Sequence, residues 1–191
     1  MSKLHKQAAE ILRQPGAVVL LPTETVYGLV CRAADAAACQ RIFELKRRPG
    51  NKLLGWFVSG TEMLEKHGIL VNETASKLID RYAPGALTII SKTASGATQG
   101  YRIPDHPLIA GILEELDEPL AQTSANSSGE PDAKSCAEAL SQLNGQVDFY
   151  VDGGALQDDA AASTVVDTTT NEVKILRRGA IDVEGFLNQQ L

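Results

Sequence analysis

The sequence feature that most constrains the fold is the run AVVLLP at residues 17–22, which Pro22 ends. A short, continuous run of β-branched and aliphatic residues predicts a strand buried on both faces, because a strand with one face in water alternates apolar and polar residues. Two further runs, LLGWFV and LTIISK, predict more strands. Residues 35–48 and the segment HPLIAGILEEL have the apolar spacing of amphipathic helices, the first with Asp35 as its N-cap.

The order of these segments indicates the fold class. Helix and strand alternate at first, and the last part of the chain is rich in strands, with FYVDGG, STVVDTTT and EVKILRRG. This order predicts an α/β fold with a mixed parallel and antiparallel sheet rather than a purely parallel, doubly wound one. The 191 residues amount to about one domain at the usual ~150 residues per domain, so residues 1–191 are expected to form a single domain.

Composition excludes several classes of protein. With 43% hydrophobic and 22% charged residues, the chain cannot be wholly disordered. No apolar stretch approaches the ~18 residues of a membrane span, and the N-terminus lacks the apolar core of a secretory signal, so a cytoplasmic protein without membrane association is expected. The cysteines, Cys31, Cys39 and Cys136, form no CxxC pair, which favours buried structural thiols over a disulfide framework or a metal site.

The charge balance limits how the chain could bind nucleic acid or nucleotide. Eighteen Lys and Arg against twenty-four Asp and Glu give a net charge of −6, so bulk charge does not attract nucleic acid. The sequence also lacks the GxxxxGK[ST] loop and the GxGxxG fingerprint. Any phosphate site must therefore be assembled from side-chain cations and hydroxyls of several segments.

One candidate for such a site is LPTETVYGL, residues 21–29. A buried strand stops at Pro22 and is followed by Thr23, Glu24, Thr25 and Tyr27, and the ends of strands are where open α/β sheets usually bind ligands. The alternative is an ordinary turn, with Gly28 permitting an unusual backbone angle.

Two further segments carry groups that suit an anion. In LKRRPG, residues 45–50, the cations Lys46 and Arg48 could converge with Lys52 on a polyphosphate, or they could simply complement a helix dipole. In QTSANSSG, residues 122–129, hydroxyl and amide groups follow a short strand and could bind an anion or form a plain loop. That segment contains Gln122, Thr123, Ser124 and Asn126.

Two arginines lie in apolar, strand-like surroundings. Arg102 in YRIPDHP and Arg177 in ILRRG each need a partner there, because an unpaired buried charge is costly. The partner could be a ligand carboxylate or phosphate, or an acid of the chain such as Asp105 or Asp167. No Ser-His-Asp or Cys-His arrangement is present, so covalent catalysis is not expected.

Taken together, these motifs carry a resemblance. PTETVYGL, KRRP, APGALT, YRIPDHPL, TSAN, STVVD and KILRRGAI stand in an order similar to that of the Sua5/YrdC/YciO family, over residues 21–181. The chain resembles the bacterial single-domain members of that family. The resemblance implies a YrdC-like fold, in which a twisted mixed sheet with flanking helices surrounds a large, positively lined concave cavity.

The resemblance also implies an activity. The family's synthases are nucleotidyltransferases that condense L-threonine, bicarbonate or CO2, and ATP into threonylcarbamoyl-adenylate, with release of pyrophosphate and with Mg²⁺ accompanying the phosphates. The product serves a threonylcarbamoyl transferase complex that modifies ANN-decoding tRNAs, so this chain is expected to act with that complex and to bind tRNA weakly, if at all. Alternatives are a non-catalytic module that binds tRNA or double-stranded RNA, and a YciO-like paralogue with different activity. The motifs KRRP and TSAN favour the synthase.

Residue by residue, the resemblance assigns two groups. Lys46, Arg48, Ser124 and Asn126 match the family's catalytic set and are expected to bind ATP together with Lys52 and Arg177. The expected threonine-binding residues are Thr23, Tyr27, Arg102, Thr123 and Ser163, and no metal-binding residue is assigned.

The sequence departs from the family pattern in three places. Leu53 to Phe57 replace a Pro-Leu start and, at Phe57, a histidine, which changes the expected contacts with the threonine side chain. Arg178 stands where a proline is common, so either Arg177 or Arg178 could face the nucleotide. Because the sequence ends shortly after the last motif, the extra C-terminal domain of longer members is expected to be absent.

Overall fold

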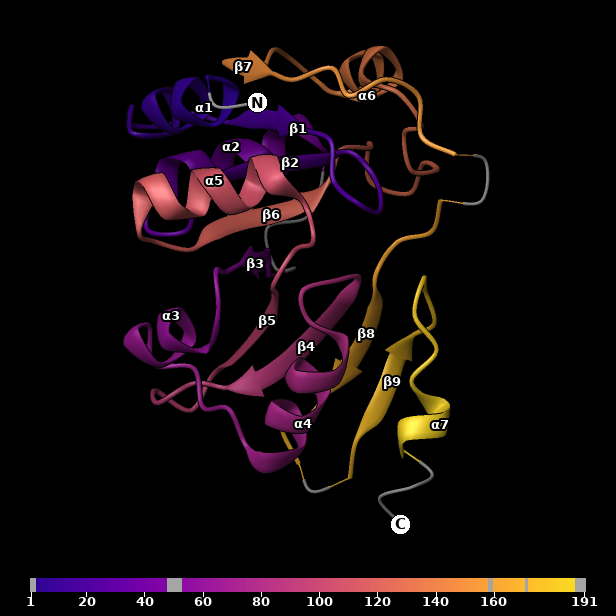
Figure 1. The fold of residues 1–191 in the computed structure, drawn as a ribbon. Coiled ribbons are helices and arrows are strands. Elements are labelled where there is room, and N and C mark those ends of the chain that lie inside the picture. The colour runs from indigo at the N-terminus through magenta and orange to yellow at the C-terminus, as the bar shows by residue number, and fades with distance from the viewer. Residues whose placement is uncertain (1–2, 48–52, 158–159, 171, 188–191) are drawn as a thin grey trace.

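The computed structural model describes residues 3–47, 53–157, 160–170 and 172–187. Its strands form one mixed sheet, in the order β7-β1-β2-β6-β3-β5-β4-β8-β9 (Figure 1). The strands are β1 Val19–Leu21, β2 Gly28–Arg32, β3 Gly55–Phe57, β4 Leu87–Lys92, β5 Thr98–Arg102, β6 Leu120–Ser124, β7 Phe149–Tyr150, β8 Thr164–Asp167 and β9 Lys174–Arg177.

The sheet contains both directions of strand pairing. Strands β1/β2, β2/β6, β3/β6, β4/β5 and β8/β9 pair antiparallel, and β1/β7, β3/β5 and β4/β8 pair parallel. The predicted α/β fold with a mixed sheet is therefore confirmed. The predicted strand in AVVLLP, buried on both faces, is also confirmed: Val19, Leu20 and Leu21 are all buried.

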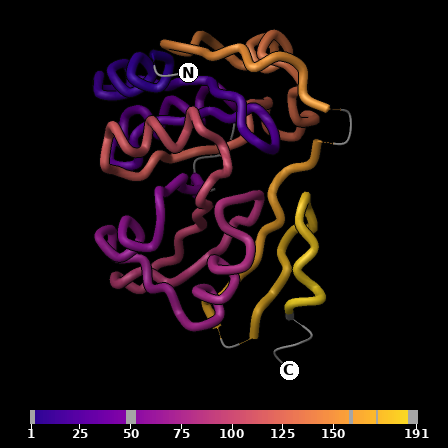
Figure 2. Tube along the Cα trace, in the orientation of Figure 1, coloured from indigo at the N-terminus to yellow at the C-terminus, as the bar shows by residue number. Residues whose placement is uncertain are grey.

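Helices pack in separate groups along the sheet. They are α1 Leu4–Leu12, α2 Ala36–Leu45, α3 Thr61–Lys66, α4 Glu73–Tyr82, α5 Pro107–Leu116, α6 Cys136–Gln142 and α7 Glu184–Leu187. In Figure 1, α1, α2 and α5 gather around β1, β2 and β6, whereas α3 and α4 lie with β4 and β5. The tube in Figure 2 shows that the first and the last described helices lie at opposite ends of the molecule.

Helix α2 begins as predicted and ends sooner. Asp35 is its N-cap, because the side chain accepts a hydrogen bond of 2.9 Å from the backbone N–H of Ala38. The helix ends at Leu45, with Lys46 as its C-cap and Arg47 in the left-handed region at φ 51°. The predicted end at residue 48 falls outside the described residues.

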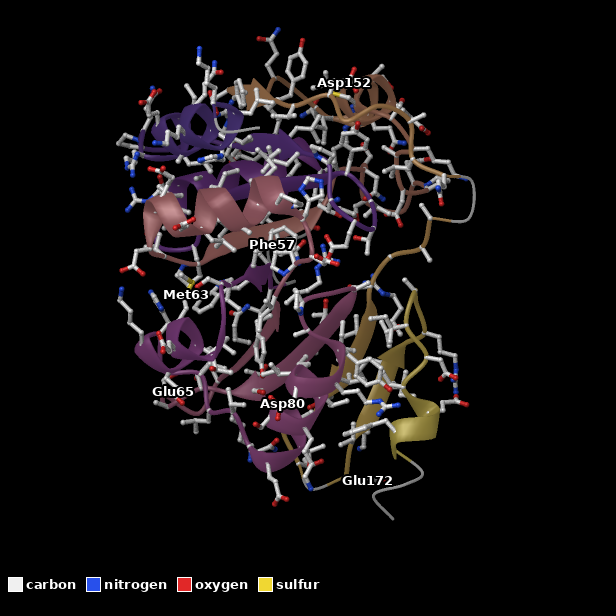
Figure 3. The ribbon with its side chains drawn as sticks, viewed as in Figure 1. Phe57, Met63, Glu65, Asp80, Asp152 and Glu172 are labelled. Atoms are coloured by element: carbon white, nitrogen blue, oxygen red, sulfur yellow. The ribbon has the colours of Figure 1, made fainter. Side chains whose placement is uncertain are left out.

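Two apolar clusters hold the helices to the sheet. One includes Leu12 of α1, Leu78 of α4 and Ile109 of α5, and the other joins Ile42 of α2 and Ala139 of α6 to their strands. Phe57 belongs to the first cluster and lies near the middle of the molecule (Figure 3).

The cysteines all carry free thiols. Cys31 and Cys136 are buried as expected, whereas Cys39 is half-buried. Within the described ranges, no helix has the length and apolar character needed to cross a membrane.

Candidate active site

A cavity of about 420 Å³ lies on one face of the sheet, and polar side chains from distant parts of the sequence line it. Hydroxyl groups dominate its walls, supplied by Thr23, Thr25, Thr88, Thr98, Thr123, Ser124 and Ser163. Its charged walls are Arg102, Arg177 and Asp132. Of the predicted site residues, the structure thus brings Thr23, Arg102, Thr123, Ser124, Ser163 and Arg177 together around one hollow.

Strand pairing explains this convergence. Gly28 of β2 stands opposite Ser124 of β6, and Gln122 of β6 stands opposite Gly55 of β3. Paired residues point to the same face of a sheet, so this register aligns side chains from three strands on the cavity side. On β4, Ile89 belongs to the core cluster that includes α4, and Thr88 points the opposite way and lines the cavity.

Glycines form part of the cavity floor. Gly28, Gly55 and Gly100 each sit within a strand and line the hollow. A Cβ on Gly55 would lie 2.8 Å from the side-chain nitrogen of Gln122, whereas a Cβ on Gly100 would make ordinary contacts of 3.6 and 3.7 Å. Glycine inside a strand often marks a place where a ligand approaches the backbone closely. Residues 24–26 do form a bend, but the unusual backbone angle proposed for Gly28 is not found: this residue begins β2 and has no positive φ.

The loop between β1 and β2 is held by its own hydroxyl groups. Thr23 Oγ1 donates to the backbone oxygen of Val26 at 2.7 Å and accepts from the backbone N–H of Thr25 at 3.0 Å. The hydroxyls of Thr23 and Thr25 lie 2.9 Å apart. This local network fixes both hydroxyl groups at the cavity wall, since side-chain bonds to nearby backbone stabilise such turns.

Tyr27 was expected to face the threonine, but it is not among the residues that line the cavity. Its hydroxyl donates to the backbone oxygen of Gly154 at 2.6 Å and accepts from the backbone N–H of Gly153 at 3.0 Å. Burial raises the pKa of this phenol. Tyr27 therefore ties the loop to residues 152–154, and we assign it a positioning role in place of a contact with substrate.

Arg102 is the most deeply buried charge of the cavity wall, with 4% of its side chain exposed. It donates to Thr25 Oγ1 at 3.0 Å and stacks 4.8 Å from the centre of the Phe57 ring. The carboxylate of Glu24 lies 3.6 Å away, too far for a hydrogen bond, and the buried Nε atom of Arg102 has no hydrogen-bond partner among the residues that the structure describes. Burial lowers the pKa of Arg102, and the charge of Glu24 opposes that shift.

The two arginines of ILRRG have different surroundings. Arg177 lines the cavity and donates to the backbone oxygen of Ser163 at 2.9 Å and to its hydroxyl at 3.1 Å. That hydroxyl lies 2.8 Å from Thr88 Oγ1. Arg178 does not line this cavity, and it forms an ion pair with Glu184 of α7. Of the two arginines, Arg177 is the one that faces the hollow.

Lys46, Ser124 and Asn126 meet as expected, although only Ser124 lines the cavity. The Lys46 ammonium donates to the backbone oxygens of Ser124 and Asn126, the latter at 2.6 Å, and to Asn126 Oδ1 at 3.1 Å. Ser124 Oγ donates to the same Oδ1 at 2.5 Å, and Asn126 Nδ2 donates to the backbone oxygen of Glu130 at 2.6 Å. Lys46, only 3% exposed, thus holds the loop that presents Ser124.

The comparison with the sequence predictions leaves two groups. Arg48 and Lys52 lie outside the described residues. Sequence reasoning did not assign a role to the cavity residues Thr88, Thr98, Gly55, Gly100 and Asp132. The sequence signal that could have predicted the cavity floor is a glycine inside a strand-like segment, as in LLGWFV and TQGYR.

Comparison with known proteins gives a consistent picture. The family model Sua5_yciO_yrdC, described as "Telomere recombination", matches residues 10–179. A protein named threonylcarbamoyl-AMP synthase from Bacillus subtilis is 36% identical over 188 residues, which cover 93% of this chain and 54% of that protein. The Escherichia coli protein YciO, called uncharacterized, is 30% identical, with 97% of this chain and 93% of that one covered.

Solved structures agree with the sequence matches. Pyrococcus abyssi Sua5 complexed with L-threonine superimposes with a TM-score of 0.87 at 32% identity, covering 96% of this chain and 56% of that one. Escherichia coli YciO gives a TM-score of 0.86 at 29% identity, covering 98% and 94%. The chain therefore spans little more than half the length of the synthase and of the Sua5 chain it matches.

Proposed function

The chain belongs to the Sua5/YciO/YrdC family, and on that premise we propose that it condenses L-threonine, bicarbonate or CO2, and ATP into threonylcarbamoyl-adenylate and pyrophosphate. The observation that carries the proposal is Arg102, a guanidinium 4% exposed that opens on a hydroxyl-lined cavity with part of its hydrogen-bonding capacity unused. A buried arginine in this state is suited to a carboxylate, because its fork of N–H donors matches the two carboxylate oxygens.

The threonine side of the site lies around Arg102. Its guanidinium would hold the substrate carboxylate, and the hydroxyls of Thr23, Thr123 and Ser163 would contact the remaining polar groups. These residues come from separate segments and reach the cavity together. Such a wall is rich in groups that both donate and accept, as a zwitterionic amino acid requires.

The nucleotide side lies around Ser124 and Arg177. Arg177 would contact a phosphate, and Lys46 with Asn126 would fix the loop that directs Ser124 at the phosphates. Arg48 and Lys52 belong to this proposal on sequence grounds alone. Two cations on the cavity wall, Arg102 and Arg177, would offset the repulsion between a carboxylate and a polyphosphate brought into one hollow.

The reaction itself then needs little from the protein beyond positioning. The neutral amine of threonine adds to CO2 and releases a proton to solvent, or condenses with bicarbonate and releases water, to form a carbamate. A carbamate oxygen attacks the α-phosphorus of ATP, and pyrophosphate leaves. Arg177 and the loop held by Lys46 would stabilise the charge on the phosphates, as in other phosphoryl-type transfers, and the enzyme would be a nucleotidyltransferase.

Magnesium would enter with the nucleotide. In the described part of the chain, no group of three or more His, Cys, Asp or Glu side chains is arranged to hold a metal ion. Asp132 is the carboxylate at the cavity wall. This donor set fits Mg²⁺, which usually keeps several waters and is held by one or two carboxylates together with substrate phosphates. When bound, the ion would neutralise charge on the leaving pyrophosphate.

The product suggests the cellular setting of the proposal. Threonylcarbamoyl-adenylate would be delivered to a threonylcarbamoyl transferase complex that modifies ANN-decoding tRNAs, and the synthase would work in the cytoplasm as a single domain. Direct tRNA binding would be weak, since the net charge is −6.

The experiment that tests the function is incubation of the purified chain with ATP, threonine and bicarbonate, followed by mass detection of the adenylate. We expect adenylate and pyrophosphate in equal amounts, and neither when threonine or bicarbonate is omitted. A YciO-like activity is the second candidate, favoured by the match to YciO over 97% of the chain. It predicts weak or no threonine-dependent pyrophosphate release.

A further inference from the structure

Gln122 is notable in the cavity because its side-chain amide makes no hydrogen bond to the residues that the structure describes. It lies on β6, it is half-buried, and it lines the hollow. Neither its oxygen nor its nitrogen makes a hydrogen bond to any residue that the structure describes, although the amide can donate two and accept two. A half-buried amide at a cavity wall, with no hydrogen bond to the described residues, is free to bind a polar group of a ligand.

The backbone opposite Gln122 is arranged to accommodate that amide. Gly55 of β3 is its cross-strand partner. A Cβ at position 55 would stand 2.8 Å from Gln122 Nε2, closer than real contacts allow. The missing side chain at Gly55 is therefore what lets the amide lie over β3, on the side where substrate would bind.

The register relates this amide to Arg102. Phe57, two residues beyond Gly55 on the same face of β3, pairs with Arg102, whose guanidinium stacks over its ring. Two residues along a strand span roughly 7 Å. The backbone positions next to the guanidinium and next to the amide, Phe57 and Gly55, are thus about one such step apart. A small molecule with a carboxylate and a hydroxyl separated by two carbons fills a gap of that size with a hydrogen bond of about 3 Å at each end.

We infer that Gln122 is a specificity-determining residue, whose amide hydrogen-bonds to the side-chain hydroxyl of an amino acid held through its carboxylate by Arg102. The inference rests on the proposed function and adds to it the group that recognises the hydroxyl. The amide oxygen accepts the hydroxyl proton, or Nε2 donates to the hydroxyl oxygen. An amino acid without the hydroxyl leaves the amide unsatisfied, and sites that bind a hydroxyl through a hydrogen bond discriminate strongly against analogues that lack it.

The first test compares Gln122→Met with the unmodified chain. Methionine has a similar length and lacks the hydrogen bonds. We would measure by calorimetry the equilibrium binding of L-threonine and of L-2-aminobutyrate, which is threonine without its hydroxyl. The unmodified chain should prefer threonine by about 100-fold. Gln122→Met should reduce that preference at least tenfold, through weaker binding of threonine, and leave binding of ATP within twofold. Gln40→Met, on the exposed face of α2, is the matched control and should change neither ligand.

The second test uses Gly55→Ala, which adds no functional group. Its Cβ must displace the flexible end of Gln122, so the preference for threonine should fall as in Gln122→Met. In a Gln122→Ala background the same Gly55→Ala change should have no effect on the preference, because the atom it displaces is gone. This pair separates displacement of the amide from a general disturbance of the strand.

The outcomes are distinct. An unchanged threonine preference in Gln122→Met overturns the inference, and so does a loss confined to ATP binding, which would place the amide at the nucleotide. A chain that binds threonine yet forms no adenylate defeats the proposed function only, and the binding preference still decides the role of Gln122. A chain that binds neither amino acid overturns both.

Discussion

The ammonium of Lys46 lies 2.6 Å from the backbone oxygen of Asn126 and 3.1 Å from its side-chain oxygen, although the two residues are 80 positions apart. One buried cation thereby fixes the end of β6 and the loop that follows it. The Lys46 charge stabilises the conformation of the loop, and of Lys46, Ser124 and Asn126 it is Ser124 that lines the cavity.

Replacing Lys46 should therefore lower both stability and activity. Lys46→Ala leaves buried carbonyl oxygens without a donor, and the free energy of unfolding should fall by about 1–3 kcal/mol. Threonine-dependent pyrophosphate release should fall at least about 100-fold, since a misplaced loop misdirects the nucleotide. Urea titration and a pyrophosphate assay measure the two effects. Lys77→Ala, which removes an exposed pair with Glu73, should change stability by at most about 0.5 kcal/mol. Unchanged stability in Lys46→Ala would contradict the structural role.

Arg177 and Arg178 provide a matched pair of adjacent cations. Arg177→Ala should raise the KM for ATP about tenfold, because a charge-assisted hydrogen bond to a phosphate is worth roughly 1.5–3 kcal/mol. Arg178→Ala should leave that KM within about twofold, because Arg178 pairs with Glu184 away from the cavity. Steady-state kinetics at saturating threonine measures both. The reverse ranking would show that Arg178 faces the nucleotide.

Replacing Arg102 should change the kinetic constants for threonine and leave the KM for ATP nearly constant. Arg102→Lys keeps a positive charge but loses the two-pronged geometry, so kcat/KM for threonine should fall at least about 30-fold while the KM for ATP stays nearly constant. The kinetic split between the two substrates is the measurement. Equal losses for both substrates would show that the guanidinium supports the whole cavity instead of one ligand.

His106 should make stability depend on pH. Burial lowers its pKa below the ordinary 6.5, with Glu24 and Asp105 opposing that shift, and its buried Nδ1 makes no hydrogen bond within the described part of the chain. A depressed pKa means that the folded state holds the neutral ring, so this contribution to stability is complete above pH 6.5. It is lost as the pH falls through the lower, folded-state value. Thermal unfolding between pH 5 and 8 should show this loss, and His106→Gln should flatten the profile. An unchanged profile in that variant would rule out His106 as its source.

Replacing Arg47 by glycine should stabilise the folded state. It lies at φ 51° just past the end of α2, where a side chain is disfavoured and glycine is common. Arg47→Gly should raise the free energy of unfolding by about 0.5–1 kcal/mol, measured by urea titration. Arg13→Gly is the control, because Arg13 caps α1 at φ −69° and gains no such relief. Destabilisation by Arg47→Gly would mean that the arginine side chain has a compensating contact.

Local patterns in the sequence predicted what local physics decides. The apolar run that forms β1, the N-cap Asp35 and the mixed sheet follow from hydrophobic periodicity and capping preferences, and the structure confirms them. The convergence of Lys46, Ser124 and Asn126 was predicted through the family resemblance, since no local rule brings residues that far apart together.

The remaining features depend on strand register, which a single sequence does not specify. The glycine floor exists because Gly28, Gly55 and Gly100 fall on the same face of paired strands. Tyr27 was expected at the substrate and instead binds residues 153 and 154, because its orientation depends on a segment 126 positions later in the chain. Gln122 gained its significance only once Gly55 was known to lie opposite.

The hydrogen bonds of the Tyr27 phenol make local opening of the structure measurable. The phenol connects the loop between β1 and β2 to Gly153 and Gly154. These two segments therefore cannot separate without exposing the Gly153 amide proton to solvent. The rate of deuterium uptake at the Gly153 amide would then report how often the loop at the cavity wall opens. A bound ligand that stabilises the closed loop would slow the uptake.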